Sequence, residues 1–275
     1  QRIIFWLRLA TLVALCLPAV DLAWRWYAGD LDPRPVTLAT HATGDWSVAL
    51  LLVSLDGLRP DYLGRGETPH LDALARGGVQ AWMRPSYPSL TFPNHYTLVT
   101  GLRPDHHGLI HNSMVDSTLG DFRLSDREAV GNGAWYGDGE PLWVTAEDAG
   151  LRTATLSWPG SEAPVHGVRP TRWYPFDETR PLDTRVDTVL GWLSEPDATR
   201  PAFATLYFEH TDSAGHHYGP DSPQLHAALA ARSALAWEAL FGEEVPCAAA
   251  RQVEDTFRQI LQLANRAAQT EASVL

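Results

Sequence analysis

Apolar runs alternate with amphipathic segments through most of the chain. Val48–Leu55 is a continuous apolar run of strand length, which predicts a central parallel strand buried on both faces. Further strands are predicted over Val79–Met83, Arg152–Trp158 and Ala202–Glu209. Helices are predicted between them, over Pro69–Ala75, Phe92–Val99, Pro141–Ala149 and Asp183–Leu193. This alternation predicts an α/β protein with a mostly parallel sheet flanked by helices.

Two stretches depart from the alternation. Residues 3–20 are mostly apolar, which predicts a signal peptide or a short membrane anchor, with a buried helix as the alternative. We therefore expect export to the periplasm or the extracellular space, or attachment to a membrane. From Gln224 onward the sequence is Ala-rich and helical, without a further predicted strand. The predicted organisation is a signal or anchor (1–23), a linker (24–47), an α/β domain (48–223) and a divergent helical tail (224–275).

Composition narrows the classes of function. A chain of 275 residues is long enough for one large domain with a sizeable core. Its net charge of -12 argues against a broad nucleic-acid surface, because such surfaces are basic. Phosphate substrates remain compatible with an acidic chain if bound cations supply positive charge locally. Only two cysteines, Cys16 and Cys247, are present, which argues against a disulfide scaffold or a thiolate metal site.

Polar residues follow two of the predicted strands. Asp56 comes directly after Val48–Leu55, and a segment predicted to be a loop, His210–His217, follows another strand with Asp212 and His216 inside it. Ligands bind at the carboxyl ends of parallel strands, so these side chains are expected to converge. Carboxylate and imidazole groups bind hard or borderline cations. The alternative is that they are turn, helix-cap or surface polar residues.

Thr91 stands where a loop is predicted to become a helix. It could serve only as an N-cap, or its oxygen could act as a nucleophile. The positive end of a helix dipole would stabilise both an alkoxide and an incoming phosphate. Asn112 is either a turn residue or a donor to a phosphate oxygen.

Three ordered stretches, Leu55–Tyr62, Pro85–Gly108 and Tyr207–Pro220, resemble the nucleotide pyrophosphatase/phosphodiesterase family of the alkaline phosphatase superfamily. The resemblance covers about residues 48–223, which would then be a partial phosphodiesterase catalytic domain. It implies an alkaline-phosphatase-like fold. It also implies metal-dependent hydrolysis of phosphodiester or pyrophosphate bonds in nucleotide-like small molecules, through a phospho-threonine intermediate.

The resemblance also implies roles for individual residues and a site with two zinc ions. Thr91 would be the nucleophile and, with Asp56, a ligand of one zinc. Asp212 and His216 would bind the other zinc. Asn112 would hold a phosphate oxygen, and Phe92 and Tyr207 would line the nucleotide pocket.

The chain departs from the family pattern after Asp221. The family continues with a Ser-Asp-His-Gly-type motif and a later histidine. In this sequence His226 is the only histidine after Asp221. Two protein ligands per zinc are fewer than the three of a catalytic site, so we expect weak zinc binding and impaired activity. One alternative is an inactive remnant or binding module. Another is a phosphomonoesterase, which would need more cationic groups near Thr91 than Arg103 offers.

Overall fold

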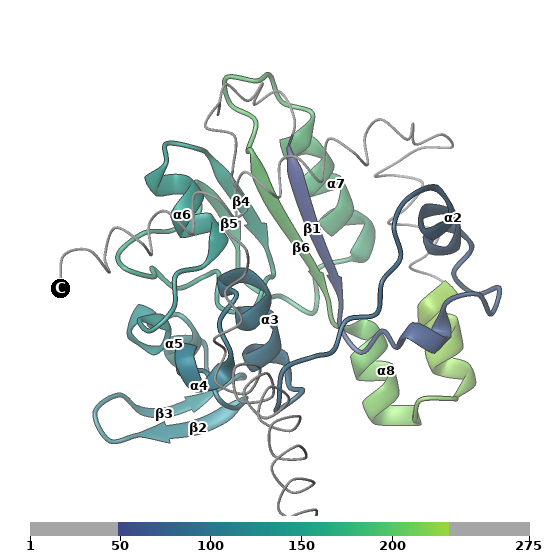
Figure 1. Cartoon of the computed structure of the whole chain (residues 1–275), viewed down its shortest axis with the longest axis horizontal. Coiled ribbons are helices and arrows are strands. Elements are labelled where there is room, and N and C mark those ends of the chain that lie inside the picture. The colour runs from purple at the N-terminus through teal and green to yellow at the C-terminus, as the bar shows by residue number, and fades with distance from the viewer. Residues whose placement is uncertain (1–48, 231–275) are drawn as a thin grey trace, which may run out of the picture. The chain divides into compact units, whose positions relative to one another are not determined.

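The computed structural model describes residues 49–230. The expectations for residues 3–20, for the linker and for most of the helical tail lie outside that range. No helix within residues 49–230 is both long and apolar enough to cross a bilayer. The centre of this part of the chain is a four-stranded sheet with the strand order β1-β6-β4-β5 (Figure 1).

All three strand pairs in this sheet are parallel, which confirms the predicted α/β class. The strands are β1 (Leu50–Leu55), β4 (Thr153–Leu156), β5 (Arg172–Tyr174) and β6 (Phe203–Phe208). A separate antiparallel hairpin is formed by β2 (Ser113–Asp116) and β3 (Gly120–Arg123). The helices are η1 (Pro60–Tyr62), α2 (Pro69–Gly77), α3 (Thr91–Thr100), α4 (Pro104–His107), α5 (Arg127–Val130), η2 (Gly133–Tyr136), α6 (Leu142–Asp148), α7 (Leu182–Leu193) and α8 (His210–Tyr218).

The core lies on both faces of β6, which is buried along its whole length. Successive side chains of a strand point to opposite faces. Phe203 and Tyr207 therefore join an aromatic core with residues of α3 and α6, including Tyr96 and Trp143. The alternate residues of β6 pack on the other face against α7 and β4, in a cluster of Ala154, Leu156, Val186, Val189, Trp192, Ala204, Leu206 and Phe208.

β1 is not the central strand that its apolar run predicted. Within residues 49–230 it is the edge of the sheet, and every residue after Leu50 is only partly buried. The central position belongs to β6. A continuous apolar run indicates that a strand is largely buried, but it does not specify which strands lie beside it.

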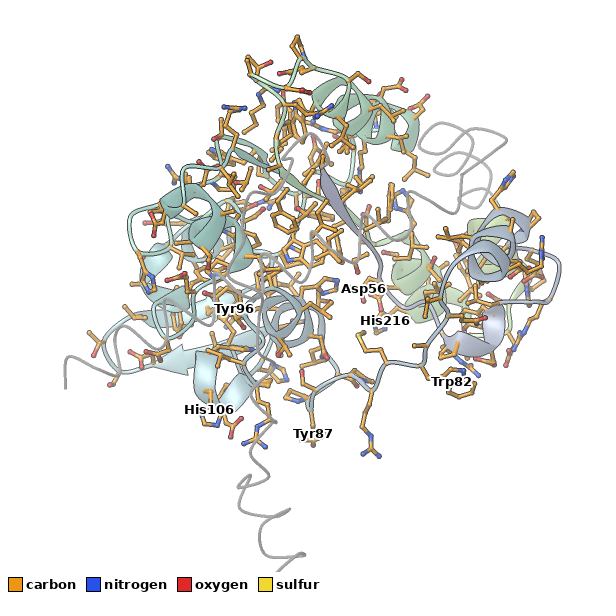
Figure 2. All side chains as sticks on the ribbon, turned by 45° about the horizontal axis from the view of Figure 1, so that its top comes forward. Asp56, Trp82, Tyr87, Tyr96, His106 and His216 are labelled. Carbon is orange, nitrogen blue, oxygen red and sulfur yellow. The ribbon has the colours of Figure 1, made fainter. Side chains whose placement is uncertain are left out.

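The segment Val79–Met83 was predicted to be a strand and is not one. It has no helix or strand assignment, and Val79 and Trp82 are 94% and 82% exposed. Figure 2 shows Trp82 projecting from this segment and Tyr87 projecting further along the same connection between α2 and α3. Strand propensity reflects how well side chains pack against neighbouring strands. Among the described residues no strand pairs with this segment.

The expected loop His210–His217 is wrong as well, because these residues form α8. Gly215 suggested a loop, but one glycine costs a helix interior only about 1 kcal/mol relative to alanine. The backbone bonds from Ser213 N to Glu209 O and from Gly219 N to Gly215 O continue through it. Asp212 and His216 thus lie one turn apart on one helix.

Candidate active site at the carboxyl ends of the strands

Asp56 follows the last residue of β1, and Gly57 brings it against the first turn of α8. Gly57 has a φ of +73°, a conformation that side chains other than glycine rarely adopt. A Cβ at this position would lie 2.7 Å from Asp212 Cα and 2.8 Å from Asp212 N. The absence of a side chain therefore lets the segments carrying Asp56 and Asp212 meet. This confirms the expected convergence of the two strand ends.

Thr91 is the first residue of α3, and Leu90 rather than Thr91 is in the N-cap position. The Thr91 hydroxyl makes no capping bond. Instead, Thr91 Oγ1 donates to Asp56 Oδ2 over 3.2 Å, and Tyr207 Oη donates to the same oxygen over 2.8 Å. The threonine oxygen thus lies at a helix N-terminus and beside a carboxylate that comes from the sheet.

Tyr207 reaches Asp56 because of the pairing of β1 with β6. Ser54 is opposite Tyr207 in the parallel register, so Asp56 lies just beyond it along β1. Burial and the neighbouring Asp56 carboxylate both raise the pKa of the Tyr207 hydroxyl. Tyr207 therefore remains a hydrogen-bond donor at neutral pH. The sequence indicated Tyr207 only as a wall of the pocket.

Asp212 and His216 form the second pair, on α8. His216 Nε2 lies 3.5 Å from Asp212 Oδ1, and the His216 side chain is 78% exposed. Burial raises the pKa of Asp212, the Asp56 carboxylate raises it further, and His216 lowers it. Figure 2 places Asp56 and His216 in the same part of the molecule, at the end of β1.

Asn112 approaches the start of α3 from the segment that leads into β2. Its Oδ1 accepts a hydrogen bond from Phe92 N over 2.9 Å. An amide side chain held by its oxygen retains two N–H donors on Nδ2. The geometry thus brings Asn112 beside the residue that follows Thr91.

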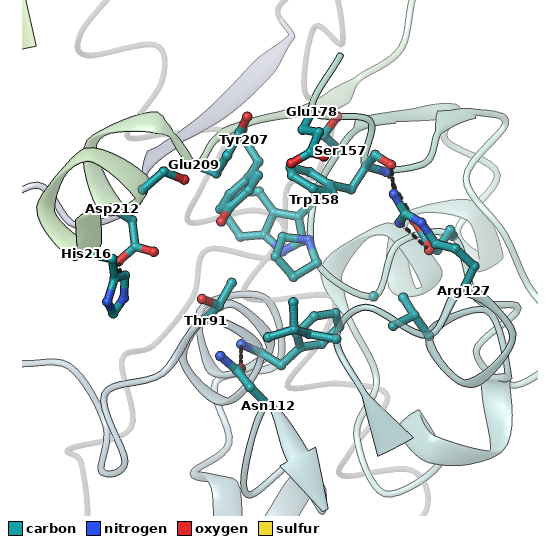
Figure 3. Close-up of a pocket in the computed structure, with 18 residues that line it drawn as sticks. Thr91, Asn112, Arg127, Ser157, Trp158, Glu178, Tyr207, Glu209, Asp212 and His216 are labelled. Atoms are coloured by element: carbon teal, nitrogen blue, oxygen red, sulfur yellow. Dashed lines mark hydrogen bonds and ion pairs between the residues drawn. The ribbon is translucent and has the colours of Figure 1, made fainter. Parts of the chain in front are cut away.

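A cavity of about 360 Å³ extends from Thr91, Asp212 and His216 (Figure 3). The predicted residues Phe92, Asn112 and Tyr207 also line it. Its remaining wall contains side chains that the sequence had not singled out, among them Arg127, Trp158, Glu162, Phe176, Glu178 and Glu209. Trp158 ends a predicted strand, a position that could have identified it. Phe176 belongs to no predicted element, so no pattern in the sequence pointed to it.

The donor types at this site suit zinc, but their number does not complete a zinc site. Zinc accepts carboxylate oxygen and imidazole nitrogen and needs three protein ligands in catalytic sites. Within residues 49–230 no three His, Cys, Asp or Glu side chains gather closely enough to hold one ion. What the described residues provide is two pairs, Asp56 with Thr91 and Asp212 with His216.

Residues 50–238 match the family model described as type I phosphodiesterase / nucleotide pyrophosphatase. An uncharacterized pyrophosphatase/phosphodiesterase of Schizosaccharomyces pombe is 43% identical over 187 residues, which are 67% of this chain and 39% of the relative. A venom phosphodiesterase of Crotalus durissus collilineatus is 45% identical over 184 residues, which are 66% of this chain and 22% of the relative. The chain therefore spans well under half the length of these curated relatives.

Solved structures show the same similarity. Murine ectonucleotide pyrophosphatase/phosphodiesterase 5 matches with a TM-score of 0.63 and 28% identity, over 78% of this chain and 53% of that one. An inactive threonine-to-alanine variant of the murine protein, in complex with AMP, matches equally well. These matches confirm the predicted fold class.

Proposed function

Because the chain belongs to the type I phosphodiesterase / nucleotide pyrophosphatase family, we propose that the Thr91 site hydrolyses a phosphodiester or pyrophosphate bond in a nucleotide-like molecule. One observation carries the proposal. Thr91 Oγ1 lies at the start of α3, is hydrogen-bonded to Asp56 Oδ2 and lines the wall of a cavity. The relative that is inactive as a threonine-to-alanine variant, in complex with AMP, supports both the nucleophile and the substrate class.

The proposed reaction has two displacement steps. Thr91 Oγ1 forms a bond to phosphorus, the bond from phosphorus to the leaving oxygen breaks, and a phospho-threonine ester results. The hydroxyl hydrogen of Thr91 already points at Asp56 Oδ2, so this carboxylate is in position to hold the proton. Water then attacks the phosphorus of the ester and releases the Thr91 oxygen, which regains a proton.

Two groups are placed to bind the phosphate during these steps. The positive end of the α3 dipole lies beside Thr91 and attracts an anion there, while the Phe92 N–H of the same turn is bonded to Asn112 Oδ1. The Nδ2 amide of Asn112 is a further donor to a non-bridging oxygen.

The rest of the cavity favours a diester over a monoester. Glu162, Glu178, Glu209 and Asp212 line it, and the lining includes one arginine, Arg127, whose Nη1 is 3.3 Å from Glu162 Oε1. A monoester carries more negative charge than a diester and would be repelled more strongly by these carboxylates. Arg103 does not line the cavity and lies 3.5 Å from Asp105.

The aromatic part of the cavity provides a surface for the base of a nucleotide. Phe92, Trp158, Phe176 and Tyr207 all line it. Stacking of an aromatic side chain on a base contributes about 1–3 kcal/mol to binding, whichever base it is. We accordingly assign Phe92 and Tyr207 to substrate binding, with Tyr207 also holding Asp56.

Asp56 with Thr91 would hold one zinc ion, and Asp212 with His216 would hold the other. When bound, such ions would supply positive charge to the attacking and leaving oxygens. Because each pair provides only two ligands, the affinity of residues 49–230 for zinc should be weak. Calorimetric titration of the chain with zinc measures this, and tight binding of two ions would contradict it.

The activity test uses the full chain, added zinc and an aryl ester of a nucleotide whose phenolate product absorbs light. We expect slow release of the phenolate that Thr91→Ala abolishes. Thr100→Ala is the matched control, because Thr100 is on the same helix and, within residues 49–230, its hydroxyl bonds to backbone groups of residues 96 and 102. Binding of the nucleotide without any turnover would identify a binding module and would contradict the proposal.

We propose that the protein acts outside the cytoplasm, exported or held at a membrane by residues 3–20. The venom relative and the apolar character of those residues support this. Fractionation of cells that express the chain tests it, and recovery of all the protein from the cytoplasm would contradict it.

A further inference from the structure

His95 lies directly behind Thr91, one turn further along α3, and is 3% exposed. Its Nδ1 is 2.7 Å from Thr91 O. A carbonyl oxygen can only accept, so Nδ1 must carry the hydrogen. Nε2 is 2.8 Å from Ser54 Oγ in β1, and in the neutral ring Nε2 accepts from that hydroxyl.

The ring of His95 is held in one orientation by its neighbours. Its edge contacts are with Trp158, at 5.3 Å between ring centroids, and with Tyr207, at 4.9 Å. His95 does not line the cavity, whereas both of those aromatic residues do. It therefore has no path to a substrate except through the residues that it touches.

We infer that His95 is a positioning residue for the proposed reaction. Its Nδ1–H holds the first turn of α3 in place, so that Thr91 Oγ1 stays hydrogen-bonded to Asp56 Oδ2. The bond to Ser54 fixes the imidazole to β1, two residues before Asp56. His95 thus connects the strand that carries Asp56 with the helix that carries Thr91. This inference rests on the proposed function of Thr91.

Two substitutions of His95 each keep one of the two hydrogen bonds of the ring and remove the other. In His95→Asn the amide nitrogen takes the place of Nδ1 and can still donate to Thr91 O, while the contact with Ser54 is lost. In His95→Gln the amide nitrogen takes the place of Nε2 and can reach Ser54, while the donor to Thr91 O is lost. Both leave a smaller side chain in the same buried space, so each is the matched control of the other.

The rate experiment measures kcat and KM for the aryl ester on the full chain. Because a misplacement of about 1 Å can cost about 100-fold in rate, we expect His95→Gln to lower kcat roughly 10- to 100-fold with KM nearly unchanged. His95→Asn keeps the donor to Thr91 O and loses only the bond to Ser54, so it should lose clearly less of kcat than His95→Gln, although both variants lose similar amounts of thermal stability. Equal kcat values in the two variants would overturn the inference, since a purely structural role predicts that result.

A second measurement does not depend on turnover. In the full chain with ¹⁵N-labelled histidine, the His95 signals are those among the eleven histidines that disappear in His95→Asn. Long-range ¹H–¹⁵N spectra should show the tautomer with hydrogen on Nδ1. Hydrogen on Nε2 alone would overturn the inference even if the wild-type chain proved inactive. Absence of turnover in the wild type would contradict the proposed function, and the tautomer would still decide the role of His95.

Discussion

At the scale of single residues, the candidate site depends on close approach between segments that are distant in sequence. Gly57 is the clearest case, because its missing side chain leaves room for the backbone of Asp212. Asp56 Oδ2 then accepts hydrogen bonds from the hydroxyl groups of Thr91 and Tyr207. One small residue thus decides whether the first pair of candidate ligands can lie beside the second.

We predict that Gly57→Ala disrupts both stability and the site. Its positive φ costs an alanine about 1–2 kcal/mol, and the overlap with Asp212 adds about 1–3 kcal/mol. Gly64→Ala is the control, because Gly64 has a similar φ of +78° and no atom lies within 4 Å of the place that a Cβ would take there. Urea unfolding measures the free energy of both variants. Equal losses in the two variants would show that the contact with Asp212 is unimportant.

The sequence singled out candidate residues but could not predict their contacts. Asp56, Thr91, Asp212 and His216 were singled out because the motifs around them are ordered and specific, and their roles as nucleophile and metal ligands stay predictions. The bond from Tyr207 to Asp56 could not be predicted, because it depends on the register in which β6 pairs with β1. The contact between His95 and Ser54 could not be predicted either, because the two residues are 41 positions apart in the chain.

At the scale of elements, an ion pair ties α7 to the junction between β6 and α8. Arg185 of α7 is fully buried, and its Nη1 and Nη2 donate to the two carboxylate oxygens of Glu209 over 2.6 and 3.0 Å. Arg185 also donates to backbone oxygens of residues 177 and 180. Because Glu209 lines the cavity and precedes α8, this pair fixes the base of the helix that carries Asp212.

We predict that Glu209→Gln lowers the free energy of unfolding at pH 7 by about 3 kcal/mol, because it leaves the buried Arg185 charge unpaired. Burial raises the pKa of Glu209, but His210 and Arg185 lower it more, to about 2 from 4.5. A lowered pKa stabilises the fold above pH 4.5, and this contribution is lost as the pH falls towards 2.

Unfolding by urea between pH 2 and pH 7 tests this prediction. The difference between the wild type and Glu209→Gln should be largest near neutrality and should shrink as the pH falls below about 4.5. Asp197→Asn is the control, because the Asp197 side chain is 74% exposed and its pair with Arg200 should contribute at most about 1 kcal/mol. A difference that is constant with pH would contradict the assignment of the pKa.

Elements with a clear hydrophobic pattern were predicted well, and exposed or polar elements, including the helix α8, were not. The helices α2, α3, α6 and α7 and the strands β1, β4 and β6 lie where the sequence placed them. The strand β5 has three residues and the β2–β3 hairpin is mostly exposed, so neither leaves a hydrophobic pattern. Val79–Met83 has such a pattern but no pairing partner among the described residues. This explains why a strand was predicted there and is absent.

At the scale of the whole molecule, family membership and the geometry of the cavity support the same chemistry. The aromatic wall suits a base, the acidic residues disfavour a highly charged monoester, and the start of α3 suits a phosphate. The shape of the cavity could not be derived from the sequence, because it combines α3, α5, α8 and the ends of β4 and β6. Only the chemical identity of the residues at its centre could be derived from the sequence.

Trapping the covalent intermediate on Thr91 tests the central claim most directly. The full chain with zinc is mixed with the nucleotide aryl ester, quenched in acid, digested and analysed by mass spectrometry. We predict that the peptide containing Thr91 gains the mass of the nucleotidyl group, that the modification maps to the Thr91 oxygen, and that Thr91→Ala abolishes it while Thr100→Ala does not. Turnover without this modification, or modification that persists in Thr91→Ala, would contradict the assignment of Thr91 as the nucleophile.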